Sequence, residues 1–335
     1  MTIRESLELR EKEYLSPYAS LSMNSQGRQK PEVECDIRPA FQRDRDKILH
    51  CKAFRRLKDK TQVFLSPEGD HYRTRLTHTL EVSQNARTIA KALKLNEDLV
   101  EAIALGHDLG HTPFGHAGER ALDRVSPLGF EHNRQSVRIV ERLERKGQGL
   151  NLTFEVRDGI LNHQTEGMPH TLEGKVVRLS DKISYIHHDM DDAVRAGILT
   201  EDDVPKEIRD VIGSTPSERL DHFVHDIVTN SMGRNDICMS EPIGNAMQAM
   251  RQFMTERVYR NSVAKSEEGK AEALMETLYE YFMKHVDEMP EEFIHLLSEG
   301  EHREQIVCDY VGSMTDRFAV ALYEDIYIPR SWAKL

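Results

Sequence analysis

The sequence contains the stretch Asn96-Glu-Asp-Leu-Val-Glu-Ala-Ile-Ala-Leu-Gly-His-Asp108, which decides both the fold class and the chemistry. Asn96 is a typical helix N-cap residue. The apolar stripe of the helix that follows is formed by Leu99, Val100, Ile103 and Ala104. His107 continues this stripe, so we expect its side chain to face the interior, with Asp108 directly after it. A buried imidazole beside a carboxylate is costly unless a cation compensates, and the pair therefore indicates a metal site.

Helical periodicity continues on both sides of this stretch, and strand-like alternation is limited to a short piece near Thr61–Leu65. The segments that we predict as helices are Asp44–Lys58, Thr77–Leu95, a segment beginning at Thr112-Pro113, Asn133–Arg145, Val156–Asn162, Glu173–Ala196, Glu218–Asn230, Pro242–Arg260, Gly269–Lys284, Pro290–Leu297 and Arg303–Tyr323. The pattern predicts an all-α protein, a helical bundle with a helical C-terminal extension.

The 335 residues suffice for one large domain or two ordinary ones. Residues 1–37 are rich in Ser, Pro, Gly and charge, and we expect an N-terminal arm there. We expect the bundle core over residues 38–197 and a helical region packed on it over residues 198–335. Residues 200–216 are acidic and contain proline, which favours a connection between helices.

The net charge of −12 argues against a general nucleic-acid coat, because affinity for phosphate backbones depends on cations. Residues 38–60 are an exception, with nine Lys or Arg against three Asp. This segment fits a solvated helix face. It equally fits a cationic wall for a small polyanion, or for a nucleotide at a subunit interface.

The four cysteines are scattered and form no C-x-x-C pair, which favours reduced thiols over a disulfide frame or a zinc knuckle. The chain begins with charged residues and no apolar run approaches the length of a membrane span. We therefore expect a soluble cytoplasmic protein without a membrane association.

Two further segments supply side chains that could bind the same cation as His107 and Asp108. His78 lies at the start of the preceding predicted helix, and Asp181 lies inside an apolar helix. On that helix Val177, Asp181, Tyr185 and Asp189 recur every four residues and share one face. Any one of these residues alone also fits a structural role. Two histidines and two aspartates in this order suit one divalent ion with positions open for water and phosphate.

The set His78, His107-Asp108 and Asp181 resembles the H…HD…D signature of the HD superfamily of metal-dependent phosphohydrolases. The surrounding sequence is similar to the deoxynucleoside triphosphate triphosphohydrolases of the dGTPase-like branch. The segments that carry this resemblance are Phe54-Arg-Arg-Leu-Lys-Asp-Lys-Thr-Gln62, Arg75-Leu-Thr-His78-Thr, His107-Asp-Leu-Gly-His-Thr-Pro-Phe-Gly-His116-Ala-Gly-Glu119, Gly129-Phe-Glu-His132-Asn and Asp181-Lys-Ile-Ser-Tyr185. The resemblance runs from about Ser16 to Asp189 and resumes at Phe253–Asn261 and Asp309–Arg317. It implies an HD-domain bundle that hydrolyses a dNTP to deoxynucleoside and inorganic triphosphate.

The resemblance implies one divalent ion per chain, Mn²⁺, Mg²⁺ or Fe²⁺, held by His78, His107, Asp108 and Asp181. His116 and Glu119 stand three residues apart on one helix, so the carboxylate can hydrogen-bond the imidazole and raise its pKa. This geometry suits a general acid–base pair, and the family uses its matching pair for proton transfer. His111 and His132 are further candidates for contacting the α-phosphate or the leaving oxygen, and each also fits a core or capping role.

The remaining candidates are predicted substrate contacts. Arg75 shares the helical face of His78 and can clamp phosphate, and Lys182 adds a point charge to the same polyphosphate. The resemblance implies that Gln62, Tyr185 and Asp189 hold the sugar and exclude ribose. It also matches Arg251 with a phosphate contact and Tyr259 with a pocket aromatic, although both positions equally fit an amphipathic helix. Tyr310 and Asp316 lie in the C-terminal segment of the resemblance without an assigned role.

Two other functions fit the same residues. A different HD hydrolase, acting on a nucleoside monophosphate, a cyclic dinucleotide or an alarmone, would use His132 and His163 as additional ligands of a dinuclear site. A nucleotide-sensing scaffold without catalysis is disfavoured by the intact ligand set. The resemblance further implies a homo-oligomer, often a hexamer, with dNTP activators at subunit interfaces, and it leaves single-stranded DNA binding open.

Overall fold

The computed structural model describes residues 1–62, 73–259 and 262–330. The predicted all-α fold is confirmed, because within these ranges the only β pairing consists of the isolated bridges Arg28–Thr153 and Thr61–Thr74. Of the strand piece predicted near Thr61–Leu65, residues 63–65 lie outside the described residues. No described helix combines the length and the apolar character that crossing a membrane requires.

The helices follow one another along the chain with short connections. The α-helices are α1 (Ile3–Tyr14), α2 (Ala40–Leu49), α3 (Lys52–Arg56), α4 (Arg75–Leu93), α5 (Glu97–Gly106), α6 (Gly115–Val125), α7 (His132–Arg138), α8 (Glu144–Gly147), α9 (Phe154–Leu161), α10 (Leu172–Arg195), α11 (Lys206–Ile212), α12 (Pro216–Ser231), α13 (Glu241–Met254), α14 (Ser262–Lys284), α15 (Glu291–Ser298), α16 (Arg303–Ser313) and α17 (Asp316–Tyr327). Single π turns follow α7 (Ile139–Leu143) and α13 (Thr255–Tyr259).

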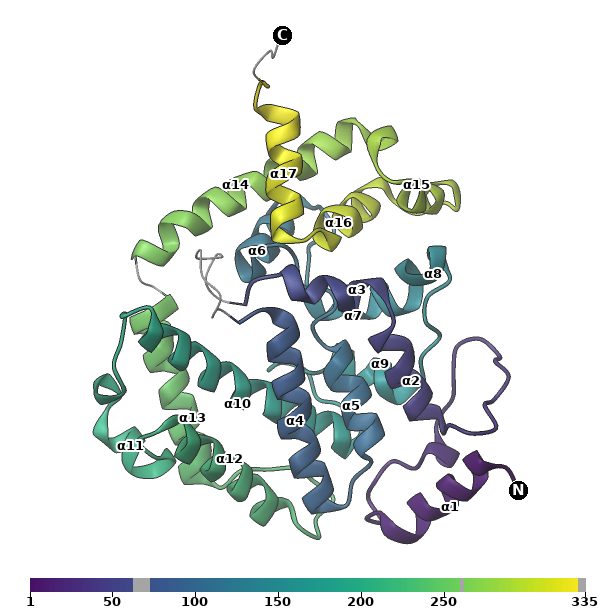
Figure 1. Cartoon of the computed structure of the whole chain (residues 1–335), viewed down its shortest axis with the longest axis vertical. Coiled ribbons are helices and arrows are strands. Elements are labelled where there is room, and N and C mark those ends of the chain that lie inside the picture. Colours follow the sequence, from purple (N-terminus) through teal and green to yellow (C-terminus); the bar gives the residue numbers. More distant parts are fainter. Residues whose placement is uncertain (63–72, 260–261, 331–335) are drawn as a thin grey trace, which may run out of the picture.

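Helix α5 is the centre of the bundle and packs against α2, α4, α9 and α10 (Figure 1). The Asn96 side chain caps it by accepting a hydrogen bond from the Leu99 N–H at 3.2 Å. The helix ends at Gly106, where a Cβ atom would lie 2.5 Å from the Ile160 side chain of α9. This close helix contact places the His107-Asp108 step at the middle of the molecule.

The helices after residue 197 form two groups (Figure 1). Helices α11–α13 extend the main hydrophobic core beside α4 and α10, through side chains such as Phe223 and Met250. Helices α14–α17 build a second core with α6, in which Tyr310 packs its ring against Phe282 and Phe293 at centroid distances of 4.9 and 5.2 Å. Because α6 belongs to this second core, the C-terminal helices directly support the segment that carries His116 and Glu119.

Two helices were not predicted. Helix α1 lies within the expected arm and begins with a capping box formed by Thr2 and Glu5. Its sequence is mostly charged and has no apolar stripe, so periodicity gives no signal there. Helix α11 lies within the predicted connection 200–216, where the acidic composition concealed it.

Two predicted helices are broken, and one starts later than expected. The segment 44–58 divides at Cys51, whose sulfur caps α3 by accepting a hydrogen bond from the Phe54 N–H. The segment 303–323 divides before α17, which Thr315 caps in the same way. The helix expected at Thr112-Pro113 begins at Gly115, because Phe114 adopts the left-handed backbone region at φ 60°.

The basic segment 38–60 is largely neutralised within the chain. Arg38 pairs with Asp46, Arg45 with Asp98, Lys47 with Glu32, and Lys52 with Glu292, each at 2.7 Å. These pairs favour the solvated-face interpretation of the segment over a free cationic wall.

Candidate metal centre and active site

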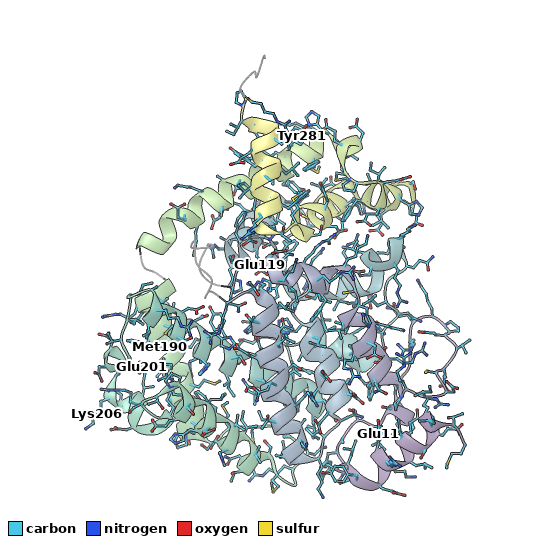
Figure 2. All side chains as sticks on the ribbon, in the orientation of Figure 1. Glu11, Glu119, Met190, Glu201, Lys206 and Tyr281 are labelled. Atoms are coloured by element: carbon cyan, nitrogen blue, oxygen red, sulfur yellow. The ribbon has the colours of Figure 1, made fainter. Side chains whose placement is uncertain are left out.

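A cleft of about 760 Å³ opens beside the end of α5. Its walls come from α4, the segment after α5, α6, α7, α10 and α13. Thirteen of the residues singled out from the sequence line it: Gln62, Arg75, His78, Asp108, His111, His116, Glu119, His132, His163, Asp181, Lys182, Tyr185 and Arg251. Glu119 lies near the middle of the molecule, where α6 meets the bundle (Figure 2).

The four predicted metal ligands meet at the floor of this cleft. The Nε2 atom of His78 lies 3.1 Å from Oδ1 of Asp181, and Nε2 of His107 lies 3.6 Å from that same oxygen. Nε2 of His107 also lies 3.3 Å from Oδ1 of Asp108. Helices α4 and α10 and the end of α5 thus bring together residues that are 103 positions apart. Ligand atoms of His78, His107 and Asp108 all lie within 4.8 Å of one another, so this group could hold a metal ion.

His107 is presented for ligation by its local backbone. Its side chain is fully buried, and its Nδ1 atom donates to the Ala104 carbonyl oxygen at 2.7 Å. With its proton on Nδ1, the ring offers the Nε2 lone pair to the site, and this buried Nε2 has no hydrogen-bond partner. Such an orphaned nitrogen beside two carboxylates fits a divalent cation.

The charges around the site favour the binding of a cation. Burial raises the pKa of Asp108, but His107, His111 and Arg75 outweigh it and hold that pKa well below its usual range. Burial lowers the pKa of His107, and the two carboxylates of Asp108 and Asp181 outweigh it and raise that pKa to about 9. The carboxylates of Asp108 and Asp181 are therefore ionised at neutral pH. Their negative charge favours either a proton on His107 or a metal ion between the side chains.

Arg75 was predicted as a free phosphate clamp, and the structure gives it an additional contact. Its Nη1 atom donates to Oδ2 of Asp108 at 2.9 Å, and both side chains are at most 4% exposed. Arg75 still borders the cleft, so it orients a predicted metal ligand from a position in the cleft wall.

Glu119 holds two imidazoles rather than the one predicted. Its carboxylate contacts Nδ1 of His116 at 3.0 Å and Nδ1 of His132 at 2.8 Å. Burial raises the pKa of Glu119, and the hydrogen bonds from His116 and His132 outweigh it and lower that pKa well below the usual range. An ionised Glu119 accepts a hydrogen bond from each Nδ1–H and so directs the two Nε2 atoms toward the cleft.

His111 completes this cluster by stacking on His132 with ring centroids 3.8 Å apart. The stack depends on Gly110, because a Cβ atom there would lie 2.3 Å from the His132 carbonyl oxygen. Burial and the neighbouring Arg75 and His132 lower the pKa of His111 well below its usual range, so its ring is neutral. Neutral His111 contacts Oδ1 of Asp108 through Nε2 at 3.3 Å and connects the two clusters.

The opposite wall of the cleft carries the predicted substrate contacts. Burial, Arg178 and Arg251 lower the pKa of Lys182 to about 8, and its side chain lines the cleft together with Tyr185 and Arg251. Asp189 is fully buried, one helical turn after Tyr185, and is not among the residues that line the cleft. The Tyr259 side chain lies outside the described residues.

Comparison with known proteins identifies the family. The HD domain matches residues 75–186, and the phosphohydrolase-associated domain matches residues 237–325. Relatives called deoxyguanosinetriphosphate triphosphohydrolase-like protein are 56% identical in Caldanaerobacter subterraneus and 50% identical in Desulfatibacillum aliphaticivorans. These alignments cover 99% and 98% of this chain, and 98% and 99% of the relatives. The chain belongs to this family.

Family membership makes the chain an HD-domain phosphohydrolase and confirms the resemblance predicted from the motifs. A crystal structure of a phosphohydrolase from Bacteroides thetaiotaomicron shares the fold, with a TM-score of 0.53 at 17% identity over 84% of this chain and 67% of that one. The HD match begins at Arg75 and contains all four residues of the predicted metal site.

Three residues of this HD-family site escaped the sequence analysis. Gln164 contacts His132 at 3.1 Å, and His188 lies against His78. Lys60 is 2% exposed, and its Nζ donates to the carbonyl oxygens of His111 and Gly312. His188 stands seven residues after Asp181 on the same helix, which is a helical spacing that could have revealed it. Lys60 gave no such signal, because it was one cation among nine in its segment.

Asp316 connects the associated domain to the HD site. Its carboxylate accepts hydrogen bonds from the backbone N–H of Thr61 at 3.1 Å and from that of Phe114 at 3.0 Å, and also from the Thr61 hydroxyl. Thr61 precedes Gln62, and Phe114 is the N-cap of α6, which carries His116. One residue of α17 thus fixes two segments that reach the cleft.

The variant Asp316→Ala is expected to expose both amides. Hydrogen bonds to a charged acceptor contribute roughly 1.5–3 kcal/mol each, so amide exchange at Thr61 and Phe114 accelerates about 10- to 100-fold. Mass-spectrometric hydrogen exchange measures this directly. The control is Asp325→Ala on the same helix, where the side chain is exposed. Equal protection of both amides in the Asp316 and Asp325 variants would show that the Asp316 carboxylate does not hold Thr61 and Phe114 in place.

Proposed function

We propose that this HD phosphohydrolase hydrolyses deoxynucleoside triphosphates to deoxynucleoside and inorganic triphosphate. The observation that carries the proposal is the convergence of four metal-ligand side chains next to the imidazole pair on Glu119. His78, Asp108 and Asp181 line one cleft with His116, Glu119 and His132, and the same cleft is lined by Lys182 and Arg251. The full-length similarity to relatives with dGTPase-like names supports the substrate class.

His78, His107, Asp108 and Asp181 would hold one divalent cation, Mn²⁺, Mg²⁺ or Fe²⁺. Bound there, the cation supplies positive charge beside the α-phosphate, where negative charge develops. Lys182, Arg251 and Arg75 neutralise the remaining phosphate oxygens. Together these side chains orient the triphosphate with its 5′ ester oxygen toward the Glu119 cluster.

A water molecule attacks the α-phosphorus, and the bond from phosphorus to the 5′ oxygen breaks. His116, held through Nδ1 by Glu119, donates the Nε2 proton to the leaving 5′ oxygen. His111 and His132 stand beside it and stabilise the transferring group. The attacking oxygen therefore ends in the triphosphate, and the deoxynucleoside keeps its own oxygen.

The sugar preference is proposed to come from Gln62 and Tyr185, which both line the cleft. A tyrosine ring packed against the 2′ carbon leaves no space for a ribose hydroxyl. Asp189 is the third predicted sugar contact; it is buried one helical turn after Tyr185.

The test is chromatography of the products from each dNTP with Mn²⁺, Mg²⁺ and Fe²⁺, performed in H₂¹⁸O. The proposal expects deoxynucleoside and triphosphate, with the label in the triphosphate. Pyrophosphate or monophosphate as the product, or binding of every dNTP without turnover, contradicts it. Activity that survives in a His78→Ala preparation would belong to a contaminant.

One observation favours a second candidate. Asp108, His132 and His163 carry ligand atoms that lie within 4.8 Å of one another, which is a second place for a metal ion. Two ions would favour phosphodiester cleavage in another type of HD hydrolase. Metal analysis separates the candidates, since the triphosphohydrolase requires one ion per chain and the alternative requires two.

The pH dependence of kcat/KM should reflect the ionisation of Lys182. Its pKa of about 8 means that the free enzyme loses this positive charge as the pH rises above 8. We therefore expect kcat/KM for the dNTP to fall above pH 8, approaching roughly tenfold per pH unit. Arginine does not titrate in this range, so the fall disappears in Lys182→Arg. A fall of the same size in that variant would assign the titration to another group.

We also propose that the chain assembles into a homo-oligomer. The specific form proposed is a hexamer that binds a dNTP activator at its subunit interfaces. Exposed apolar side chains on α17 and just after it, among them Phe318, Tyr327 and Ile328, support an interface there. A sizing column run with and without dNTP tests this, and a monomer under both conditions refutes it. Single-stranded DNA remains a candidate ligand of such an assembly.

A further inference from the structure

A second histidine, His188, contacts the metal-ligand candidate His78. Nδ1 of His78 and Nδ1 of His188 are 3.2 Å apart, and the two rings are nearly perpendicular at 84°. His78 comes from α4 and His188 from α10, the two helices that also bring His78 and Asp181 together. His188 is 1% exposed, so water does not compete for this contact.

The other face of His188 meets a carboxylate. Its Nε2 atom contacts Oε2 of Glu81, which stands three residues after His78 on α4. Glu81 also lies 3.5 Å from Nε of Arg73, and Arg73 is anchored by Asp191 at 2.7 Å and Asp192 at 3.2 Å. These groups form a row that runs from a charged network at the surface, through two imidazoles, to the floor of the cleft.

The row fixes where the ring protons lie. A nitrogen that faces a carboxylate must carry a proton, which places the proton of His188 on Nε2. Nδ1 of neutral His188 then has a free lone pair and accepts a hydrogen bond from the Nδ1–H of His78. With its Nδ1 proton committed to His188, His78 would offer its Nε2 lone pair to a cation bound between this atom and Asp181, which lies 3.1 Å away; the cation would take the place of the proton that otherwise faces this carboxylate.

We infer that Glu81 and His188 are positioning residues that hold His78 in the orientation and tautomer needed to bind the cation. The inference rests on the proposed function in one respect, that His78 is a metal ligand. It goes beyond that function because it assigns a positioning role to Glu81 and His188, which do not line the cleft. Partners that orient a metal-binding histidine are typically worth 10- to 100-fold in metal affinity.

The test is calorimetric titration of the metal-free full-length protein with Mn²⁺. We expect His188→Leu to weaken binding about 10- to 100-fold. His188→Asn retains an acceptor at the position of Nδ1 and should recover part of the loss. His187→Gln is the matched control, because it changes the adjacent, half-buried imidazole, and it should bind Mn²⁺ like the wild type.

Glu81→Gln provides a second route if His188→Leu does not fold, since the Glu81 side chain is 39% exposed. It should weaken Mn²⁺ binding by a smaller factor, and it should add nothing in the His188→Leu background, because the row is already interrupted there. This coupling distinguishes positioning from general destabilisation, which would add independently.

The outcomes separate the two claims. If the wild-type protein binds no Mn²⁺, His78 is not a ligand and the proposed function fails. If the wild type binds Mn²⁺ and the His188→Leu and Glu81→Gln proteins bind it equally well, the positioning role is overturned while the proposed function stands.

Discussion

His107→Ala abolishes both Mn²⁺ binding and dNTP hydrolysis in the account developed above. The Nε2 atom of His107 is buried and orphaned, and its lone pair faces Asp108 and Asp181. Without the His107 imidazole, Asp108 and Asp181 lose the neutral ligand between them, and the cation keeps three of its four proposed protein ligands. A bound metal ion is worth several kcal/mol of transition-state stabilisation, and 1.36 kcal/mol corresponds to a factor of ten. We therefore expect kcat/KM to fall by at least about 10³-fold, as measured by triphosphate release.

The control for this variant is His170→Ala, which removes an exposed histidine that borders neither cluster. Circular dichroism and thermal unfolding of the metal-free proteins establish that His107→Ala is folded, since removing a buried ring also costs stability. A folded His107→Ala protein that hydrolyses dNTP at more than a few per cent of the wild-type rate contradicts the assigned ligand role.

His116→Gln should separate proton transfer from metal binding. The His116 side chain is 52% exposed and belongs to none of the four ligand positions, so its loss leaves the fold and the Mn²⁺ affinity unchanged. Loss of a general acid typically costs 10²- to 10⁴-fold, and we expect a fall of about that size in kcat with little change in KM. Rapid-quench measurement of a single turnover determines whether the chemical step is the one that slows.

Two comparisons make this prediction specific. Glu119→Gln should reproduce much of the loss, because it no longer holds Nδ1 of His116 and His132. His132→Gln shares the carboxylate but not the proposed proton donor, so its effect should be smaller. A larger fall for His132→Gln than for His116→Gln would move the general acid to His132.

The interior position of His107 and the shared face of Asp181 and Tyr185 were predictable because helical spacing decides which side chains share a face. His107 continued the apolar stripe of α5, and Asp181 fell on one stripe with Tyr185, so period alone indicated the helix face on which each residue lies. The all-α fold was predictable for the same reason. Family motifs supplied what period does not, namely that the separate helices converge on one cleft.

Contacts between residues far apart in the sequence were not predictable. Nothing in the sequence shows that Glu119 serves His132 thirteen positions away, or that Arg75 pairs with Asp108. The late start of α6 depends on the left-handed backbone of Phe114, and Asp316 stabilises that turn from the opposite end of the chain. Helix α1 was missed because its stability comes from capping and charge rather than from an apolar face.

The central claim is that two imidazoles and two carboxylates hold a single cation at the floor of the cleft. The most direct measurement is anomalous diffraction from a crystal grown with Mn²⁺. We predict one peak per chain at coordination distance from His78, His107, Asp108 and Asp181. A peak held instead by the His116–Glu119–His132 cluster, or full loading of the protein with no peak at these four residues, would contradict the account.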